Sequence, residues 1–140
     1  MSRELERFPL LAGLSEQERS KLTQELEWLS FEAGASLFVE GDAADGLLLL
    51  LEGQVRLTSS RAEGAGECGP GTSFGSLALV IDAGRRASVE ACTPCRVLRL
   101  RREGFQRLAQ ASPRAACRIL EAVVRESAEL VERVLEAPRD

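Results

Sequence analysis

The 140-residue sequence contains no histidine, and this absence removes several classes of active site at once. Histidine is the usual general base at neutral pH, the base of Ser-His-Asp triads and a ligand of Cys2His2 zinc sites. The chain also shows no nucleophile next to a suitable base and no metal-binding constellation. We therefore expect a protein that is not an enzyme and that holds no metal ion or other cofactor.

Long hydrophobic runs are also missing from the chain. The longest uninterrupted runs, such as Leu47–Leu51, are far shorter than the roughly 20 residues that cross a bilayer. Residues 1–7 lack the apolar core of a signal peptide. These two absences predict a cytoplasmic protein without a membrane segment.

An excess of positive charge is absent as well. The formal net charge is −4, so the protein as a whole has no field that attracts nucleic acid. Four arginines do gather near residue 100, but strand alternation sends Arg99 and Arg101 to one face and leaves Arg96 and Arg102 on the other. We expect a solvated surface here and no direct DNA binding.

Cysteine is scarce, with four in the chain, and Cys92 and Cys95 have the spacing of a redox or metal half-site. A thioredoxin-type pair opens a helix, whereas the residues after Cys95 alternate like a strand. The proline between the two cysteines is typical of a turn that joins two strands. This context favours reduced cysteines that are buried or lie in strands.

The pattern of the remaining residues predicts one domain over residues 1–140, mainly β with flanking helices. We expect this domain to consist of an N-terminal helical segment, 1–30, a β-barrel, 31–100, and C-terminal helices, 101–140. Glycines at short intervals punctuate the middle segment in the manner of a meandering β-structure. Residues 87–91 and 96–100 are expected to pair as its closing hairpin.

The helical segments at both ends carry capping signals. Ser15 and Glu18 have the spacing of a capping box, and leucines recur on one helical face through about residue 29. Trp28, beside that leucine stripe, is expected at the edge of the core. Ser112-Pro113 predicts an N-cap followed by proline at the first position of a long final helix.

The final helix has an unusually wide apolar stripe. One side of it has room to cover the barrel while the other meets a second copy of the chain. With fewer than four heptads the pattern does not establish a coiled coil, so a helix that packs only on its own domain stays an alternative.

Residues 74–89 carry the clearest chemical pattern. Gly75 and the small side chains of Ser76 and Ala78 let a backbone come close to a ligand. If residues 77–80 form a helical turn, its free N–H groups face the same point. An arginine from the next strand would complete an anion site, because a guanidinium donates two parallel hydrogen bonds to phosphate oxygens.

This stretch resembles the phosphate-binding cassette of the cyclic-nucleotide-binding domain family. The family pattern is Phe-Gly-Glu, an apolar residue, Ala-Leu, an apolar residue, four variable positions, and then Arg, small, Ala, small. The matching residues are Phe74, Gly75, Leu77, Ala78, Leu79, Val80, Arg85, Ala87 and Ser88. The resemblance implies a jelly-roll β-barrel with an N-terminal helix and a long C-terminal helix, and it implies that Arg85 holds the cyclic phosphate.

Two positions depart from the family pattern. Ser76 stands where the family has the glutamate that accepts a hydrogen bond from the ribose 2′-hydroxyl, and Arg86 stands where a small residue is expected. Losing a bond to a carboxylate costs roughly 1.5–3 kcal/mol, about ten- to hundredfold in affinity. A one-residue bulge would exchange the roles of Arg85 and Arg86, and the sequence leaves both arrangements open.

The resemblance implies a non-enzymatic sensor that binds cyclic AMP or cyclic GMP, forms a homodimer through its C-terminal helix, and signals to a partner protein when that helix moves. The residues expected to contact the ligand are Gly75, Ser76, Leu77, Ala78, Arg85, Arg86, Ala87 and, on the final helix, Ser127. The alternative, favoured by Ser76, is a degenerate member that lost the nucleotide and serves as a dimerisation or protein-interaction scaffold. Regulators of the catabolite-activator type continue into a helix-turn-helix domain, which we do not expect here because the sequence stops at Asp140.

Overall fold

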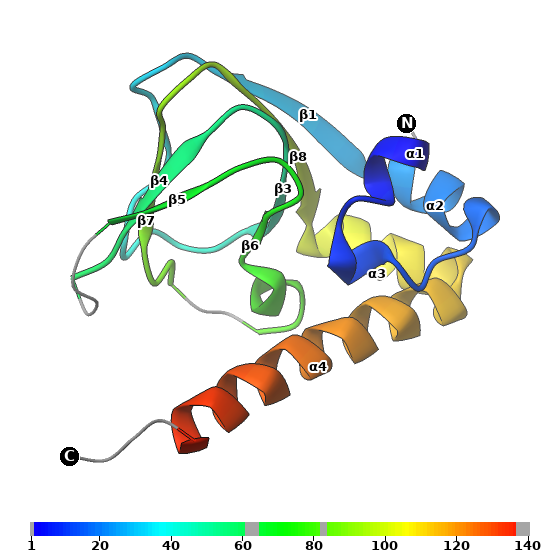
Figure 1. Ribbon diagram of the computed structural model, residues 1–140. Coiled ribbons are helices and arrows are strands. Elements are labelled where there is room, and N and C mark those ends of the chain that lie inside the picture. Colours follow the sequence, from blue (N-terminus) through cyan, green and yellow to red (C-terminus); the bar gives the residue numbers. More distant parts are fainter. Residues whose placement is uncertain (1, 61–64, 82–83, 137–140) are drawn as a thin grey trace.

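The computed structural model describes residues 2–60, 65–81 and 84–136, with side chains of the last helix described up to Glu126. Within these residues eight strands form two four-stranded antiparallel sheets that face each other as a barrel (Figure 1). The first sheet has the order β1 (Leu26–Phe31), β8 (Cys95–Arg101), β3 (Gly46–Glu52) and β6 (Ser73–Phe74). The second has the order β2 (Ser36–Phe38), β7 (Ser88–Ala91), β4 (Val55–Thr58) and β5 (Ala65–Cys68). This arrangement confirms the predicted jelly-roll architecture.

Strand β3 separates two hydrophobic cores. Its alternate residues Leu48 and Leu50 face the barrel interior, where they pack with Val97 of β8. Leu47, Leu49 and Leu51 face the other way and pack against the helices. The run of five leucines is therefore part of a strand that is covered on both faces, as a central strand between two layers requires.

The N-terminal helices form part of the layer that covers the first sheet. They are α1 (Ser2–Leu5), the 3-10 helix η1 (Pro9–Leu11) and α2 (Glu16–Thr23). The predicted capping box is confirmed: the Glu18 N–H donates to Ser15 Oγ at 3.2 Å, and the Ser15 N–H donates to Glu18 Oε1 at 2.8 Å. The backbone bond from Ser15 is the largest cause of a lowered pKa of the Glu18 carboxyl.

The prediction that this helix continues to about residue 29 is wrong. Helix α2 ends at Thr23, and β1 pairs with β8 along its whole length, with Trp28 opposite Leu98. Trp28 is 48% exposed rather than at the edge of the core, and the Arg96 guanidinium lies over its ring at 4.9 Å. Leucine spacing fits both a helix and this strand, and the distant partner strand decides between them.

The predicted closing hairpin is also wrong. Strands β7 and β8 follow each other closely, but β7 pairs with β2 and β4, whereas β8 pairs with β1 and β3. The turn between them therefore crosses from one sheet to the other. A short loop joining two alternating segments predicts pairing only when both strands belong to the same sheet.

All four cysteines are free, as expected, but they are not all buried or in strands. Cys95 is buried at the start of β8, and burial raises the pKa of its thiol. Cys92 is exposed in the turn before it, and Cys117 is exposed on the final helix. Among the described residues no group of three or more cysteine or acidic side chains has the arrangement of a metal site.

Two helices close the chain, α3 (Arg102–Ala111) and α4 (Pro113–Glu136). The predicted N-cap is present, with the Ala115 N–H donating to Ser112 Oγ at 3.3 Å. Helix α4 packs against α3 and η1 in its first half and then runs out beneath the barrel (Figure 1). No helix within the described part of the chain is long and apolar enough to cross a bilayer.

Replacing Ser15 with alanine removes half of the capping box and is expected to lower the free energy of unfolding by about 1 kcal/mol. Ser20→Ala is the matched control, because Ser20 is exposed inside the same helix, where alanine is the better helix former. Urea unfolding followed by far-UV circular dichroism measures both variants. Equal losses in the two would show that the cap is not the cause.

Candidate functional site

The site is built around a glycine that lies between strand β6 and a short helix. Gly75 has a φ of +77°, in the left-handed region that favours glycine, and the 3-10 helix η2 (Ser76–Leu79) begins directly after it. A Cβ atom at this position would lie 2.1 Å from Nη1 of Arg85. Gly75 is therefore required twice, once for the backbone turn and once for the approach of the guanidinium.

Arg85 reaches this glycine from a backbone fixed on both sides. Its N–H donates to the Asp42 carbonyl at 2.7 Å, and its own carbonyl accepts from the Gly41 N–H at 2.9 Å. Its side chain is 5% exposed, and the guanidinium lies over the Phe38 ring, 4.4 Å from the centroid. Nη2 donates to the Gly46 carbonyl at 3.0 Å.

The other terminal nitrogen of Arg85 is left without an acceptor. Among the buried side-chain nitrogen and oxygen atoms of the described residues, Nη1 of Arg85 is the one that has no hydrogen-bond partner. Burying such a donor costs about 1–3 kcal/mol, and more when it is charged. Burial lowers the pKa of this guanidinium, and the nearby Asp45 carboxylate partly offsets that effect. Arginine nevertheless stays protonated in proteins, so Nη1 is a charged donor that faces Gly75.

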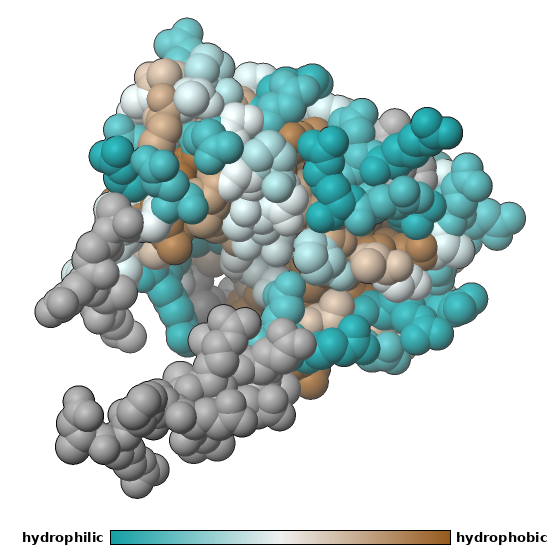
Figure 2. All heavy atoms as spheres, in the orientation of Figure 1, coloured by the Kyte–Doolittle hydropathy of each residue, from teal (hydrophilic) through white to brown (hydrophobic). Residues whose placement is uncertain are grey.

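A cavity of about 400 Å³ opens at this point. The predicted site residues that line it are Gly75, Ser76, Leu77, Ala78, Arg85, Arg86 and Ala87. Leu57 from β4 and Glu126 from α4 also line it, and the surface is hollowed between the barrel and α4 (Figure 2). Its volume is in the range of small-molecule sites.

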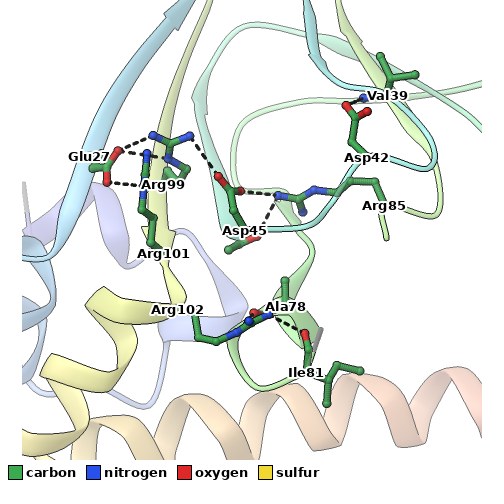
Figure 3. A network of polar contacts seen from close by, with 11 residues as sticks. Glu27, Val39, Asp42, Asp45, Ala78, Ile81, Arg85, Arg99, Arg101 and Arg102 are labelled. Atoms are coloured by element: carbon green, nitrogen blue, oxygen red, sulfur yellow. Dashed lines mark hydrogen bonds and ion pairs between the residues drawn. The ribbon is translucent and has the colours of Figure 1, made fainter. Parts of the chain in front are cut away.

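A chain of ion pairs leads away from the cavity (Figure 3). Asp45 bridges two arginines, with Oδ1 3.4 Å from Arg85 Nη2 and Oδ2 3.5 Å from Arg99 Nη1. Arg99 continues to Glu27 at 2.6 Å, and Arg101 joins the same carboxylate at 2.8 Å. The carboxylate of Asp45 thus orients the buried guanidinium while leaving Nη1 available to a ligand.

Residues 28–112, more than half of the chain, match the sequence profile of the cyclic nucleotide-binding domain. The chain belongs to this family. Its curated relatives include the cAMP-dependent protein kinase regulatory subunit of Aspergillus niger, which is 38% identical over 105 residues, 74% of this chain and 26% of that protein. The chain thus spans about a quarter of the length of the curated relatives it matches.

Several solved structures share the fold of this chain. The N-terminal domain of a regulator from Streptomyces coelicolor A3(2) superimposes with a TM-score of 0.82 at 29% identity, over 94% of each chain. The catabolite activator protein of Thermus thermophilus gives a TM-score of 0.78 at 26% identity, over 91% of this chain and 62% of that one. The likeness therefore extends beyond the barrel to the flanking helices.

The structure of this cyclic nucleotide-binding domain distinguishes its two neighbouring arginines. Arg85 is buried and faces Gly75, whereas the side chain of Arg86 is exposed at the cavity, and its carbonyl accepts from Ser59 Oγ at 3.2 Å. The arrangement in which a bulge exchanges the two is not the one observed. Ser127 belongs to α4 but lies just beyond the last described side chain, so its predicted contact with the base stays a prediction.

Sequence reasoning missed several residues that hold the cassette of this domain. Arg102, expected on a solvated face, donates from Nε to the Ala78 carbonyl at 3.1 Å and from Nη2 to the Ile81 carbonyl at 2.8 Å (Figure 3). It thereby ties the turn after Gly75 to the first residue of α3. No local pattern marks this role, because the contacts join residues more than twenty positions apart.

Proposed function

We propose that this domain binds a cyclic nucleotide, with the cyclic phosphate against Arg85. The observation that carries the proposal is the buried Nη1 of Arg85, a charged donor without an acceptor on a residue that lines the 400 Å³ cavity. A phosphate oxygen supplies the missing acceptor, and hydrogen bonds between charged groups are about twice as strong as neutral ones. The N–H groups at the start of η2, directly after Gly75, are proposed to hold the remaining phosphate oxygens.

The rest of the cavity suits a nucleoside. Its walls are largely apolar, with Leu57 on the barrel side and Leu77 and Ile81 from the cassette. Leu77 and Ile81 are 40% and 47% exposed, so they offer apolar surface that a base would cover. An inorganic anion alone would leave this surface in water, which favours a ligand that carries both a phosphate and an apolar ring.

Titration calorimetry with cyclic AMP and cyclic GMP tests the proposal, with inorganic phosphate as the control ligand. We expect saturable heats for at least one cyclic nucleotide and none for phosphate at the same concentration. Flat traces from a protein with a cooperative unfolding transition would overturn the proposal. They would support the alternative, a scaffold that kept the fold and lost the nucleotide.

The signal is proposed to leave the domain through α4. This helix packs on α3 and η1, and Arg102 connects α3 to the cassette, so the ligand and the helix share one set of contacts. A cyclic nucleotide shifts the helix only if it binds one helix position more tightly than another. The resulting change at the surface of α4 is what a partner protein would detect.

The same helix is proposed to join two copies of the domain. Val124 is 67% exposed on α4, next to a shallow groove bordered by Cys117 and Leu120. Val124→Glu would place an unpaired charge in the contact, so we expect the dissociation constant of the homodimer to rise more than about tenfold. Gln106→Glu on the exposed side of α3 is the control. Sedimentation velocity measures both, and a monomeric native protein would overturn the dimer.

A further inference from the structure

The side of α4 that faces the domain changes character where it reaches the cavity. Ala115, Ile119 and Val123 follow one another at four-residue steps and are all buried in the core beneath the helix. Residues three or four positions apart share a helix face, so Glu126 continues this stripe. It breaks the apolar pattern at the point where the helix lines the 400 Å³ cavity.

Without the Glu126 carboxylate, the described charged side chains that line the cavity would offer hydrogen-bond donors and no acceptor. Arg85 and Arg86 bring only donors, and Ser76 brings a short hydroxyl to the position where the family pattern has an acid. Among the described lining residues Glu126 is the only carboxylate. Ionised carboxylates accept hydrogen bonds and do not donate them, so Glu126 serves a neutral donor of the ligand and not its phosphate.

We propose that Glu126 accepts the hydrogen bond from the ribose 2′-hydroxyl that Ser76 is too short to take. This inference rests on the proposed binding of a cyclic nucleotide. Ribose recognition then belongs to α4 instead of the cassette, and the 2′-hydroxyl is bound only while the helix lies over the cavity. Its contact with Glu126 therefore favours one position of the helix over others, which is the differential affinity that a signal requires.

The test compares cyclic AMP with 2′-deoxy-cyclic AMP, which lacks only the hydroxyl. We expect the native protein to prefer cyclic AMP by about ten- to hundredfold, the value of a hydrogen bond to a charged acceptor. Glu126→Gln is expected to reduce this preference to less than about threefold, with little change for the deoxy ligand. Adding Ser76→Glu to that variant is expected to restore the preference, because the acceptor returns to the cassette.

Glu103→Gln, which removes an exposed carboxylate from α3, is the matched control and is expected to keep the native preference. A preference unchanged in Glu126→Gln overturns the inference. An equal loss of affinity for both ligands also overturns it, because Glu126 would then contact another part of the nucleotide. The same conclusion follows if Glu126→Gln weakens the binding of cyclic AMP but not that of the cyclic phosphate of purine riboside. If the native protein binds neither cyclic nucleotide, the proposed function fails and this inference fails with it.

Discussion

Arg85→Ala is expected to lower the affinity for a cyclic nucleotide by about ten- to hundredfold, because the charge-assisted hydrogen bond from Nη1, worth roughly 1.5–3 kcal/mol, is lost. The guanidinium is pre-positioned by Phe38, Asp45 and the Gly46 carbonyl, so little entropy is spent on ordering it when the ligand binds. Removing it leaves the two hydrophobic cores intact, since neither includes Arg85. The variant should therefore fold and fail to bind.

Two further variants make this result specific. Arg85→Lys keeps the charge but not the planar fork, so we expect an intermediate loss. Arg86→Ala removes an exposed guanidinium at the same cavity and should cost less than about fivefold, as exposed charge pairs do. Calorimetry gives the affinities, and thermal unfolding verifies the fold. Native affinity in Arg85→Ala, or an equal loss in Arg86→Ala, would contradict the assignment.

Gly75→Ala is expected to reduce the same affinity more than about tenfold and to lower the stability of the fold as well. A side chain at φ +77° carries strain of order 1–3 kcal/mol. The new Cβ would also lie 2.1 Å from Arg85 Nη1, so the guanidinium must leave the wall of the cavity. The backbone strain lowers stability, and the displaced guanidinium lowers binding.

Gly34→Ala separates the two effects. Gly34 has a similar φ of +91°, but a Cβ there would meet no atom within 4 Å. Both variants should therefore lose stability in urea unfolding, while only Gly75→Ala loses affinity in calorimetry. Equal affinities in the two glycine variants would show that the approach of Arg85 to Gly75 is not needed for binding.

Local features of this domain could be predicted from its sequence. The capping box at Ser15, the N-cap at Ser112 and the turn after Gly75 each depend on residues within a few positions of one another. Residues 26–31 form a strand because they pair with β8, which lies far along the chain. The leucine spacing in this segment suits a helix equally well. The predictions failed where pairing with a distant strand determines the secondary structure.

The candidate site likewise combines residues that could be predicted from nearby sequence with residues that could not. The family pattern implied an arginine beside Gly75, because both residues belong to the cassette, and the folded chain shows that Arg85 and not Arg86 takes this position. Asp45, which orients Arg85, lies 40 positions earlier, in a turn that carries no mark of this role. Glu126 comes from the final helix, and only the folded chain brings it to the same cavity.

The five leucines of β3 also bear on how the chain survives before it is folded. Short uncharged runs of this kind promote aggregation, and natural sequences place charged gatekeeper residues inside or beside them. Here both faces of the strand are buried, so no position inside it tolerates a charge. The acidic residues Asp45 and Glu52 lie just outside the run. Protection of the nascent chain thus falls to these two flanking charges and to the speed with which β8 covers the strand.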